Sequence, residues 1–244
     1  MGIKYLVNEK FFDSWSNDMA YVLGYWYADG SVERVPAIRG HYIRISSVDL
    51  TLIEQVKAAM KSKHNIVEYP PRVKGRMRYV LRIGSKPLFD AMNKHGLTEH
   101  KSLSMKFPKI PKKYLPAFIR GYFDGDGCIH AEKNVTGKTK RLVVIFTSGS
   151  WDFLLSLQSL LHDVAGVSSN RKIGVTESIG TAYQLRYGTR DSLRLFLFMY
   201  PKMSGRYLHL SRKYDIFVQY LQLRGLTDKN LPDALRAQGP MVKW

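Results

Sequence analysis

Apolar and polar residues alternate along the chain with two different periods. From Leu52 to Met60 the apolar residues recur every three or four positions, which predicts an amphipathic helix over residues 50–61. Residues 31–34 and 42–46 are short β-prone segments, which is typical of the two strands of a hairpin. The same reasoning predicts a helix over 18–28, capped by Asn17 or Asp18 and closed by Asp29-Gly30, a second hairpin of 66–72 and 78–83, and a short helix over 87–94.

This series of elements is repeated in the second part of the chain. Residues 22–32 read VLGYWYADGSV and match residues 119–129, which read IRGYFDGDGCI. Further matches follow downstream, among them Ile45–Ser47 with Phe146–Ser148. The repeat predicts an α+β fold of two pseudo-symmetric α-β-β-α-β-β-α halves with antiparallel sheets. We expect the halves at 15–100 and 116–225, a linker at 101–115 and a tail at 226–244.

Small residues occupy matched positions in the two motif segments. They are Gly24 and Ala28 in the first and Gly121 and Gly125 in the second. A spacing of four places each pair on one stripe of a helix, where two backbones can approach closely. Glycine inside a helix costs up to about 1 kcal/mol relative to alanine. We therefore expect the two motif helices to pack on each other, with Tyr25, Trp26, Tyr122 and Phe123 in the core.

Each motif segment ends on an aspartate that is followed by glycine, at Asp29 and at Asp126. Taken singly, Asp-Gly is an ordinary end for a helix. Two carboxylates brought together by packed helices would repel, and each would raise the pKa of the other. A hard divalent cation such as Mg²⁺ removes this repulsion and is completed by water and substrate phosphates. The pair therefore indicates metal-assisted phosphodiester hydrolysis.

The charge balance indicates a polyanionic partner. The chain has 38 Lys and Arg against 20 Asp and Glu, a formal net charge of +18. Such a field attracts nucleic acid, although nonspecific binding to acidic membranes or ribosomal RNA would give the same composition. No apolar run is long enough to span a membrane. The single cysteine, Cys128, excludes disulfides within the chain and cysteine-rich zinc sites, and it favours a reducing intracellular compartment.

Basic residues gather in the predicted hairpins, which makes the hairpins the candidate DNA-reading surface. A twisted β-ribbon can enter the major groove, where arginine reads guanine, while other basic residues contact phosphates. About half of such residues could simply solubilise an exposed face. The candidates are Arg34, Arg39, Arg44, Arg72, Lys74, Arg76, Arg78 and Arg82 in the first half, and Lys133, Lys138, Lys140, Arg141, Arg171, Lys172, Arg186 and Arg190 in the second.

The two motif segments resemble those of the LAGLIDADG homing endonucleases. The second segment matches more strongly, and the first carries Tyr27 where the second has the acidic Asp124. The resemblance covers about residues 15–225, and two motifs in one chain imply the monomeric form. It implies motif helices at the centre of a DNA-binding saddle of antiparallel sheets. It also implies cleavage of both strands of a long asymmetric target across the minor groove, with short 3′ overhangs.

The resemblance also implies roles for individual residues. Asp29 and Asp126 would bind Mg²⁺, with Mn²⁺ or Ca²⁺ as substitutes for binding, and the peptide oxygens of Ala28 and Gly125 would assist. Lys101 and Lys213 would organise water or stabilise developing charge near the scissile phosphates, and the alternative is that each is a solvated surface lysine. Some relatives have glutamine where this chain has Ser47 and Ser148, so a water-positioning role there is open. The Tyr27–Asp124 difference suggests unequal cutting of the two strands.

Three other functions are compatible with parts of the pattern. An RNA maturase that assists intron splicing could use the same fold, with intron RNA as its partner. A non-catalytic DNA-binding regulator is less consistent with two intact aspartates. A self-splicing intein would end in His-Asn, and this sequence ends in Val-Lys-Trp. We therefore expect a freestanding or intron-encoded protein in a bacterial or archaeal cytoplasm or an organelle matrix.

Overall fold

The computed structural model describes residues 5–71, 73–99, 103–133, 139–176, 182–202, 206–227 and 229–236, with only the backbone described at 133, 139 and 140. The chain divides into two compact units, Met1–Gly125 and Asp126–Trp244, and each is described by itself. Within the described residues, no helix combines the length and apolar character that crossing a bilayer requires.

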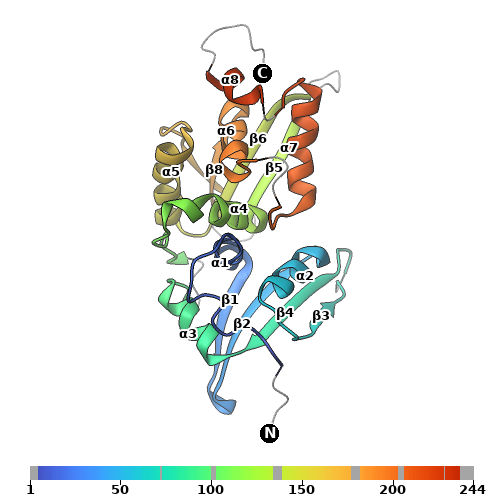
Figure 1. The fold of residues 1–244 in the computed structure, drawn as a ribbon, viewed down its shortest axis with the longest axis vertical. Helices are drawn as coiled ribbons and strands as arrows, with labels where there is room; N and C mark the ends of the chain where they lie inside the picture. Colours follow the sequence, from blue (N-terminus) through green and yellow to red (C-terminus); the bar gives the residue numbers. More distant parts are fainter. Residues whose placement is uncertain are drawn as a thin grey trace. The chain divides into compact units, whose positions relative to one another are not determined.

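The first unit contains one four-stranded antiparallel sheet in the order β1-β2-β4-β3 (Figure 1). Its elements follow the order predicted from the sequence. They are α1 (Asn17–Asp29), β1 (Gly30–Val35), the 3-10 turn η1 (Pro36–Ile38), β2 (Gly40–Ser47), α2 (Leu50–Ala59), β3 (Ile66–Tyr69), β4 (Arg78–Gly84), α3 (Lys86–Lys94), the 3-10 turn η3 (Lys112–Tyr114) and α4 (Leu115–Asp126), whose last residue opens the second unit.

The second unit repeats the arrangement with a sheet in the order β5-β6-β8-β7. Its elements are β5 (Gly127–Lys133), β6 (Thr139–Ser148), α5 (Trp151–Ala165), β7 (Ile173–Thr176), β8 (Ala182–Tyr187), α6 (Thr189–Met199), α7 (Ser211–Leu223) and α8 (Leu231–Arg236). The predicted α+β class and the doubled antiparallel sheet are thereby confirmed.

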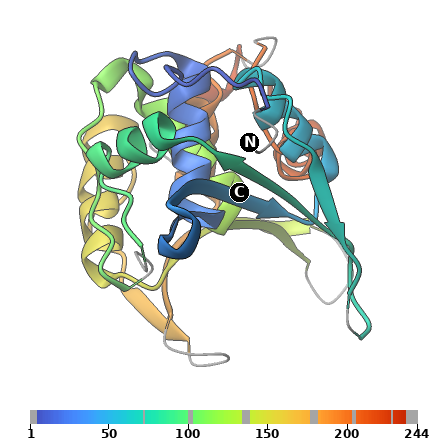
Figure 2. The same cartoon turned by 90° about the horizontal axis from the view of Figure 1, so that it is seen from below.

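Each sheet has one face covered by helices and one face that is open. In the first unit α1, α2 and α3 lie on the same side of the sheet (Figure 2). Ile43 and Ile45 of β2 are fully buried on that side. Successive side chains of a strand point to opposite faces, so Tyr42 and Arg44 lie on the open face, where they are only partly covered. The open face is thus the polar face.

The ends of α1 differ in detail from the prediction. Ser16 is the N-cap, and its hydroxyl accepts the N–H of Met19 at 3.0 Å. Neither Asn17 nor Asp18 takes that role, because the helix already begins at Asn17. Gly30 has φ −97° and continues directly into β1, so it is not the left-handed cap that Asp-Gly suggested. Glycine is required there because a Cβ would collide with the Trp26 indole.

Two other predicted boundaries were too long, each for a local reason. The helix predicted over 50–61 ends at Ala59, and Lys61 has φ 49°, which leaves the helical region. The strand predicted over 66–72 ends at Tyr69. Pro70 and Pro71 follow it, and proline has no N–H to continue a β ladder.

Candidate active site

The motif helices α1 and α4 pack backbone to backbone through their glycines. A Cβ on Gly24 would collide with the carbonyl oxygen of Phe118, and a Cβ on Gly121 would collide with that of Tyr21. Each glycine therefore lies directly against the partner helix, which confirms the close packing predicted from the small-residue stripes. The aromatic residues predicted to be core, Tyr25, Trp26, Tyr122 and Phe123, are all fully buried.

The same contact continues to the ends of the helices. A Cβ on Gly125 of α4 would collide with the Ala28 methyl group of α1 and would lie 3.2 Å from the carboxylate oxygen Oδ2 of Asp29. Asp29 is the last residue of α1 and is exposed. Asp126, the last residue of α4, follows Gly125 directly and is partly buried. The Asp29 carboxylate therefore lies beside Gly125, which directly precedes Asp126 in the chain.

The electrostatic potential at a helix C-terminus is unfavourable for a negatively charged carboxylate. The macrodipole places negative potential there, which favours cations and disfavours anions. The last turns of α1 and α4 contain no basic residue that would offset it. Each of Asp29 and Asp126 thus combines a carboxylate with the negative end of a helix, and both arrangements favour a bound cation.

The available donors fit a hard cation with incomplete protein coordination. Carboxylate oxygens of Asp29 and Asp126 and the peptide oxygens of Ala28 and Gly125 are all hard ligands of the kind that Mg²⁺ and Ca²⁺ prefer. Across the part of the chain that the structure describes, no cluster of three or more His, Cys, Asp or Glu could form a closed metal cage. Such hard oxygen donors fit an ion that keeps several of its waters.

Tyr25 lies behind Asp29 and is held in its protonated form. Its hydroxyl donates to the Ser46 carbonyl at 3.4 Å. Burial and, secondly, the negative charge of Asp29 raise the pKa of Tyr25 far above its usual range. The phenol therefore acts as a hydrogen-bond donor at any physiological pH, and it adds no charge beside the aspartate.

Lys213 is buried next to the second motif. It projects from α7, and its ammonium Nζ donates a hydrogen bond of 2.5 Å to the Gly127 carbonyl, one residue beyond Asp126. The solvated-surface alternative for Lys213 therefore does not hold. Lys101, its counterpart in the sequence repeat, lies outside the described residues.

The two motifs differ at Tyr27 and Asp124, and each of these side chains forms a hydrogen bond within the protein. The Tyr27 hydroxyl donates to the His95 carbonyl at 2.6 Å. The buried Asp124 accepts from the Tyr21 hydroxyl at 2.8 Å. Asp124 thus links the two motif helices and Tyr27 links α1 to the end of α3, so these contacts give no direct reason for unequal strand cutting.

Ser47 and Ser148 play the same part in the two halves. The Ser47 hydroxyl accepts the N–H of Asp49 at 3.0 Å, and the Ser148 hydroxyl accepts that of Ser150 at 3.1 Å. Each bond shapes the turn between a strand and the following helix, namely α2 and α5.

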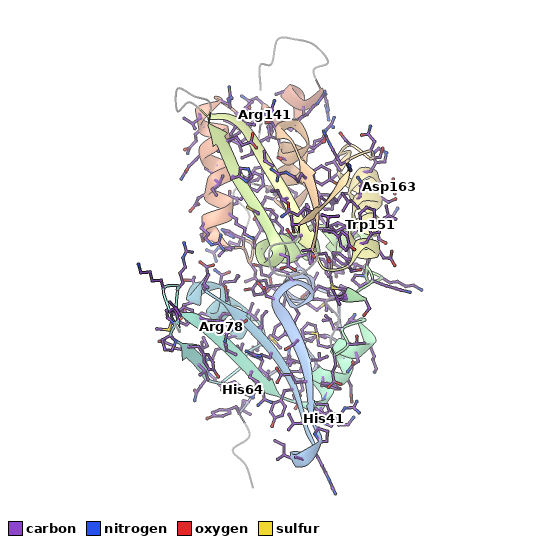
Figure 3. The ribbon with its side chains drawn as sticks, turned by 180° about the vertical axis from the view of Figure 1, so that it is seen from behind. His41, His64, Arg78, Arg141, Trp151 and Asp163 are labelled. Atoms are coloured by element: carbon purple, nitrogen blue, oxygen red, sulfur yellow. The ribbon has the colours of Figure 1, made fainter. Side chains whose placement is uncertain are left out.

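Several predicted DNA contacts lie on the open sheet faces or in exposed connections. Arg44, Arg78 and Arg82 lie on the open face of the first sheet, and Arg141 and Arg186 on that of the second. Figure 3 shows Arg78 and Arg141 on strands β4 and β6 of their respective units. Arg39 follows the η1 turn, Lys74 and Arg76 lie between β3 and β4, and Lys172 precedes β7; all four are exposed.

Three of the predicted DNA contacts, Arg34, Arg171 and Arg190, also contact groups within the protein. The Arg34 guanidinium lies 5.7 Å from the ring centroid of Phe89, on helix α3. Arg190 belongs to α6 and donates to the Leu235 carbonyl at 2.7 Å. Arg171 is paired at 3.0 Å with the buried carboxylate of Asp191. These arginines have partners within the protein. Arg72 and Lys138 lie outside the described residues, as do the side chains of Lys133 and Lys140.

The sequence prediction did not identify Glu33 and Tyr42, which share the open face with Arg44 and Arg82. The signal was present, because period-two alternation in the predicted strands places residues 31, 33, 42 and 44 on one face. Positive charge alone does not indicate the acidic and aromatic residues of this face.

Curated relatives of this chain include parts of much longer proteins. It is 29% identical over 131 residues to the DNA-directed RNA polymerase subunit Rpo1C of Methanocaldococcus jannaschii, covering 52% of this chain and 15% of that protein. It is 24% identical over 194 residues to an uncharacterized protein of the same organism, covering 77% and 68%. The chain spans about a seventh of the length of Rpo1C and of a probable translation initiation factor IF-2 that it also matches.

Solved structures with the same fold include complexes with DNA. The homing endonuclease I-GzeII with its DNA target aligns with a TM-score of 0.56 at 11% identity, covering 92% of this chain and 94% of that one. I-SmaMI, bound to uncleaved DNA in the presence of calcium ions, aligns at 0.54 and 16% identity, covering 91% and 96%. These identities show a shared fold. The family model of the LAGLIDADG-like domain matches residues 16–95 and 113–199, more than half of the chain. The chain therefore belongs to the LAGLIDADG-like domain family.

Proposed function

We propose that this protein is a sequence-specific double-strand DNA endonuclease that depends on Mg²⁺. The observation that carries the proposal is the end of the motif-helix pair, where the Asp29 carboxylate lies at Gly125, the residue before Asp126. Paired carboxylates at two helix C-termini attract divalent cations, and a net charge of +18 attracts DNA.

Asp29 and Asp126 are the proposed metal ligands, with the peptide oxygens of Ala28 and Gly125 beside them. A bound Mg²⁺ would neutralise charge at the scissile phosphodiester. Hydrolysis adds water across a phosphorus–oxygen bond, so that one product ends in a phosphate and the other in a hydroxyl. The protein's own part is to hold the two carboxylates in place on packed helices that cannot slide.

Lys213 and Tyr25 are proposed as positioning residues. Lys213 holds the peptide of Gly127 directly after Asp126, and Tyr25 donates to Ser46 behind Asp29. Each fixes the backbone or the side-chain environment next to one aspartate. Lys101 stays a candidate on the resemblance alone.

The open sheet faces are the proposed DNA surface, and two motifs in one chain support action as a monomer. Arg44, Arg78 and Arg82 in one unit and Arg141 and Arg186 in the other are the proposed sheet contacts. The exposed residues in the connections would contact DNA phosphates on either side of the bases that are read; they are Arg39, Lys74, Arg76 and Lys172. The open faces differ in sequence between the units, so the proposed target is asymmetric.

A selection experiment tests this function. A library of random DNA duplexes is bound by the full chain in Ca²⁺, and the enriched sequence is then incubated with Mg²⁺ or Mn²⁺. We expect enrichment of one long sequence and cleavage of both of its strands. Stable binding of an enriched duplex without nicking in either metal would contradict the enzyme proposal, because it would describe a DNA-binding regulator.

A further inference from the structure

One acidic side chain, Glu33, lies among the arginines of the open face of the first unit. The Glu33 carboxylate on β1 pairs with Arg82 Nε on β4 at 3.1 Å and with an Arg44 Nη1 on β2 at 3.6 Å. It also accepts from the Ser31 hydroxyl at 3.3 Å. Its oxygens therefore have donors on three of the four strands, β1, β2 and β4, and the side chain is 29% exposed.

The Arg82 guanidinium is held from a second side by an aromatic ring. It lies 3.6 Å from the ring centroid of Tyr42, a cation–π contact. Glycines flank that ring: a Cβ on Gly40 would collide with it, and a Cβ on Gly84 would lie 3.1 Å from its Cε1 atom. The ring can lie flat because both neighbours lack a side chain. Arg82 is thereby fixed by Glu33 at Nε and by Tyr42 at its face.

An arginine fixed in this way is suited to a base rather than to a phosphate. Its Nε–H is taken by Glu33, which leaves the terminal Nη groups as donors at the open face. The nearby carboxylate repels a charged phosphate much more strongly than the neutral O6 and N7 acceptors of guanine. Holding the side chain in advance also lowers the entropy that binding would cost.

We propose that Glu33, Tyr42 and Arg82 form a guanine-reading cluster in which Arg82 contacts the base and Glu33 and Tyr42 position it. This inference rests on the proposed function, because it assigns one base of the DNA target to one residue. It makes guanine a requirement at one position of the half-site that the first unit contacts.

The second unit provides an internal comparison. The cross-strand row Ser31–Arg44–Arg82 corresponds to Cys128–Ile145–Arg186. His130 stands where Glu33 does and Val143 where Tyr42 does. Among the described residues, Arg186 has no ion-pair partner, and it is exposed. The matching position of the other half-site should therefore tolerate all four base pairs.

Binding selection without metal tests the cluster separately from cleavage. Random duplexes are selected in EDTA by the wild type, by Glu33→Gln, by Arg82→Lys and by the control Glu68→Gln, which changes an exposed glutamate on β3. We expect the wild type and the control to require one guanine in one half-site. Both cluster variants should lose about tenfold to hundredfold of the preference for that guanine, while preferences elsewhere in the site persist. Glu33→Gln should also bind random DNA no more weakly than the wild type, because it removes a negative charge.

A base analogue then identifies the contact. Replacing the required guanine by 7-deazaguanine removes the N7 acceptor, which should weaken binding by the wild type more than binding by Arg82→Lys. A thermal unfolding midpoint equal to that of the wild type would show that a variant has not lost its guanine preference through misfolding. If Glu33→Gln does not fold, the analogue experiment on the wild type decides by itself. If the selection enriched no sequence at all, that result would overturn both the proposed function and this inference. Three results would overturn this inference alone. The enriched sequence could lack the guanine, or binding could be insensitive to loss of the guanine N7. In the third, a folded Glu33→Gln protein would keep the preference for the guanine.

Discussion

Single hydroxyl groups stabilise the motif helices at the positions where the two motifs differ. Tyr21 donates to the buried Asp124, and Tyr27 donates to the His95 carbonyl. The sequence comparison of Tyr27 with Asp124 suggested a catalytic asymmetry between the halves. The contacts assign both residues to packing, so substitutions there should change stability and leave the ratio of strand cleavage alone.

Removing these hydroxyls tests that assignment. Tyr21→Phe leaves a buried carboxylate without one donor and should lower the free energy of unfolding by about 1–3 kcal/mol. Tyr27→Phe frees a peptide carbonyl and should cost about 1 kcal/mol. Urea unfolding measures both. A Tyr27→Phe protein with normal stability but a changed ratio of top-strand to bottom-strand cleavage would show that the residue acts in catalysis.

The buried ammonium of Lys213 has a predicted role that a surface lysine would lack. Lys213→Met removes the donor to the Gly127 carbonyl, which should let the peptide beside Asp126 move. We expect cleavage to slow at least about tenfold and the half-saturating Mg²⁺ concentration to rise, with DNA affinity little changed. Lys229→Met, at an exposed position, is the matched control. Equal Mg²⁺ dependence in the two variants would refute the positioning role.

At the scale of elements, the α1–α4 pair tolerates no side chain at its glycines. An alanine methyl at Gly24 or Gly121 would meet the backbone of the opposite helix, which cannot rotate away. Gly24→Ala and Gly121→Ala should each destabilise the first unit by more than about 2 kcal/mol, since overpacking of a tight contact typically costs about 1–3 kcal/mol. Differential scanning calorimetry can measure the shift in Tm.

Gly174→Ala is the control for these two variants. Its Cβ would lie 3.9 Å from the Gln184 carbonyl oxygen, an ordinary contact, so its effect should be close to zero. If Gly24→Ala or Gly121→Ala were as stable as Gly174→Ala, the two helices would not pack as closely as the structure has them.

The elements themselves could be predicted from the sequence because their signals are local. Leu52, Ile53 and Val56 repeat at helical spacing, and all three are buried on α2. The stripes around Gly24 and Gly121 likewise predicted a close helix contact. The ends of strands were less predictable. At Pro70 and Pro71, for example, the strand stops because proline has no N–H to form the next hydrogen bond between strands.

The site could be predicted only in part, because its remaining members come together through strand pairing. Nothing near Glu33 in the sequence indicates Arg82, which becomes its neighbour through two sheet registers. Lys213 reaches Gly127 from a distant helix. Arg34, Arg171 and Arg190 were predicted as DNA contacts from charge alone, and charge does not reveal that each already has a partner within the protein.

For the whole molecule, the formal net charge of +18 predicts strongly salt-dependent DNA binding. Release of counterions from about 6–10 phosphates lowers affinity by roughly 10³–10⁵ between 50 and 200 mM salt. Fluorescence anisotropy with a random duplex measures the slope of log affinity against log salt. A flat dependence would mean that the basic faces do not contact the DNA backbone.

The most direct test of the account is strand-resolved cleavage of the selected duplex by Asp29→Asn, Asp126→Asn and the control Asp163→Asn. Asp163 is exposed on α5 (Figure 3), so its substitution changes charge by the same amount. Each motif variant should lose cleavage by at least about hundredfold while its affinity in Ca²⁺ stays within a few-fold of the wild type, and the control should cut normally. Wild-type cleavage by either motif variant would contradict the assignment of the two aspartates as the metal site.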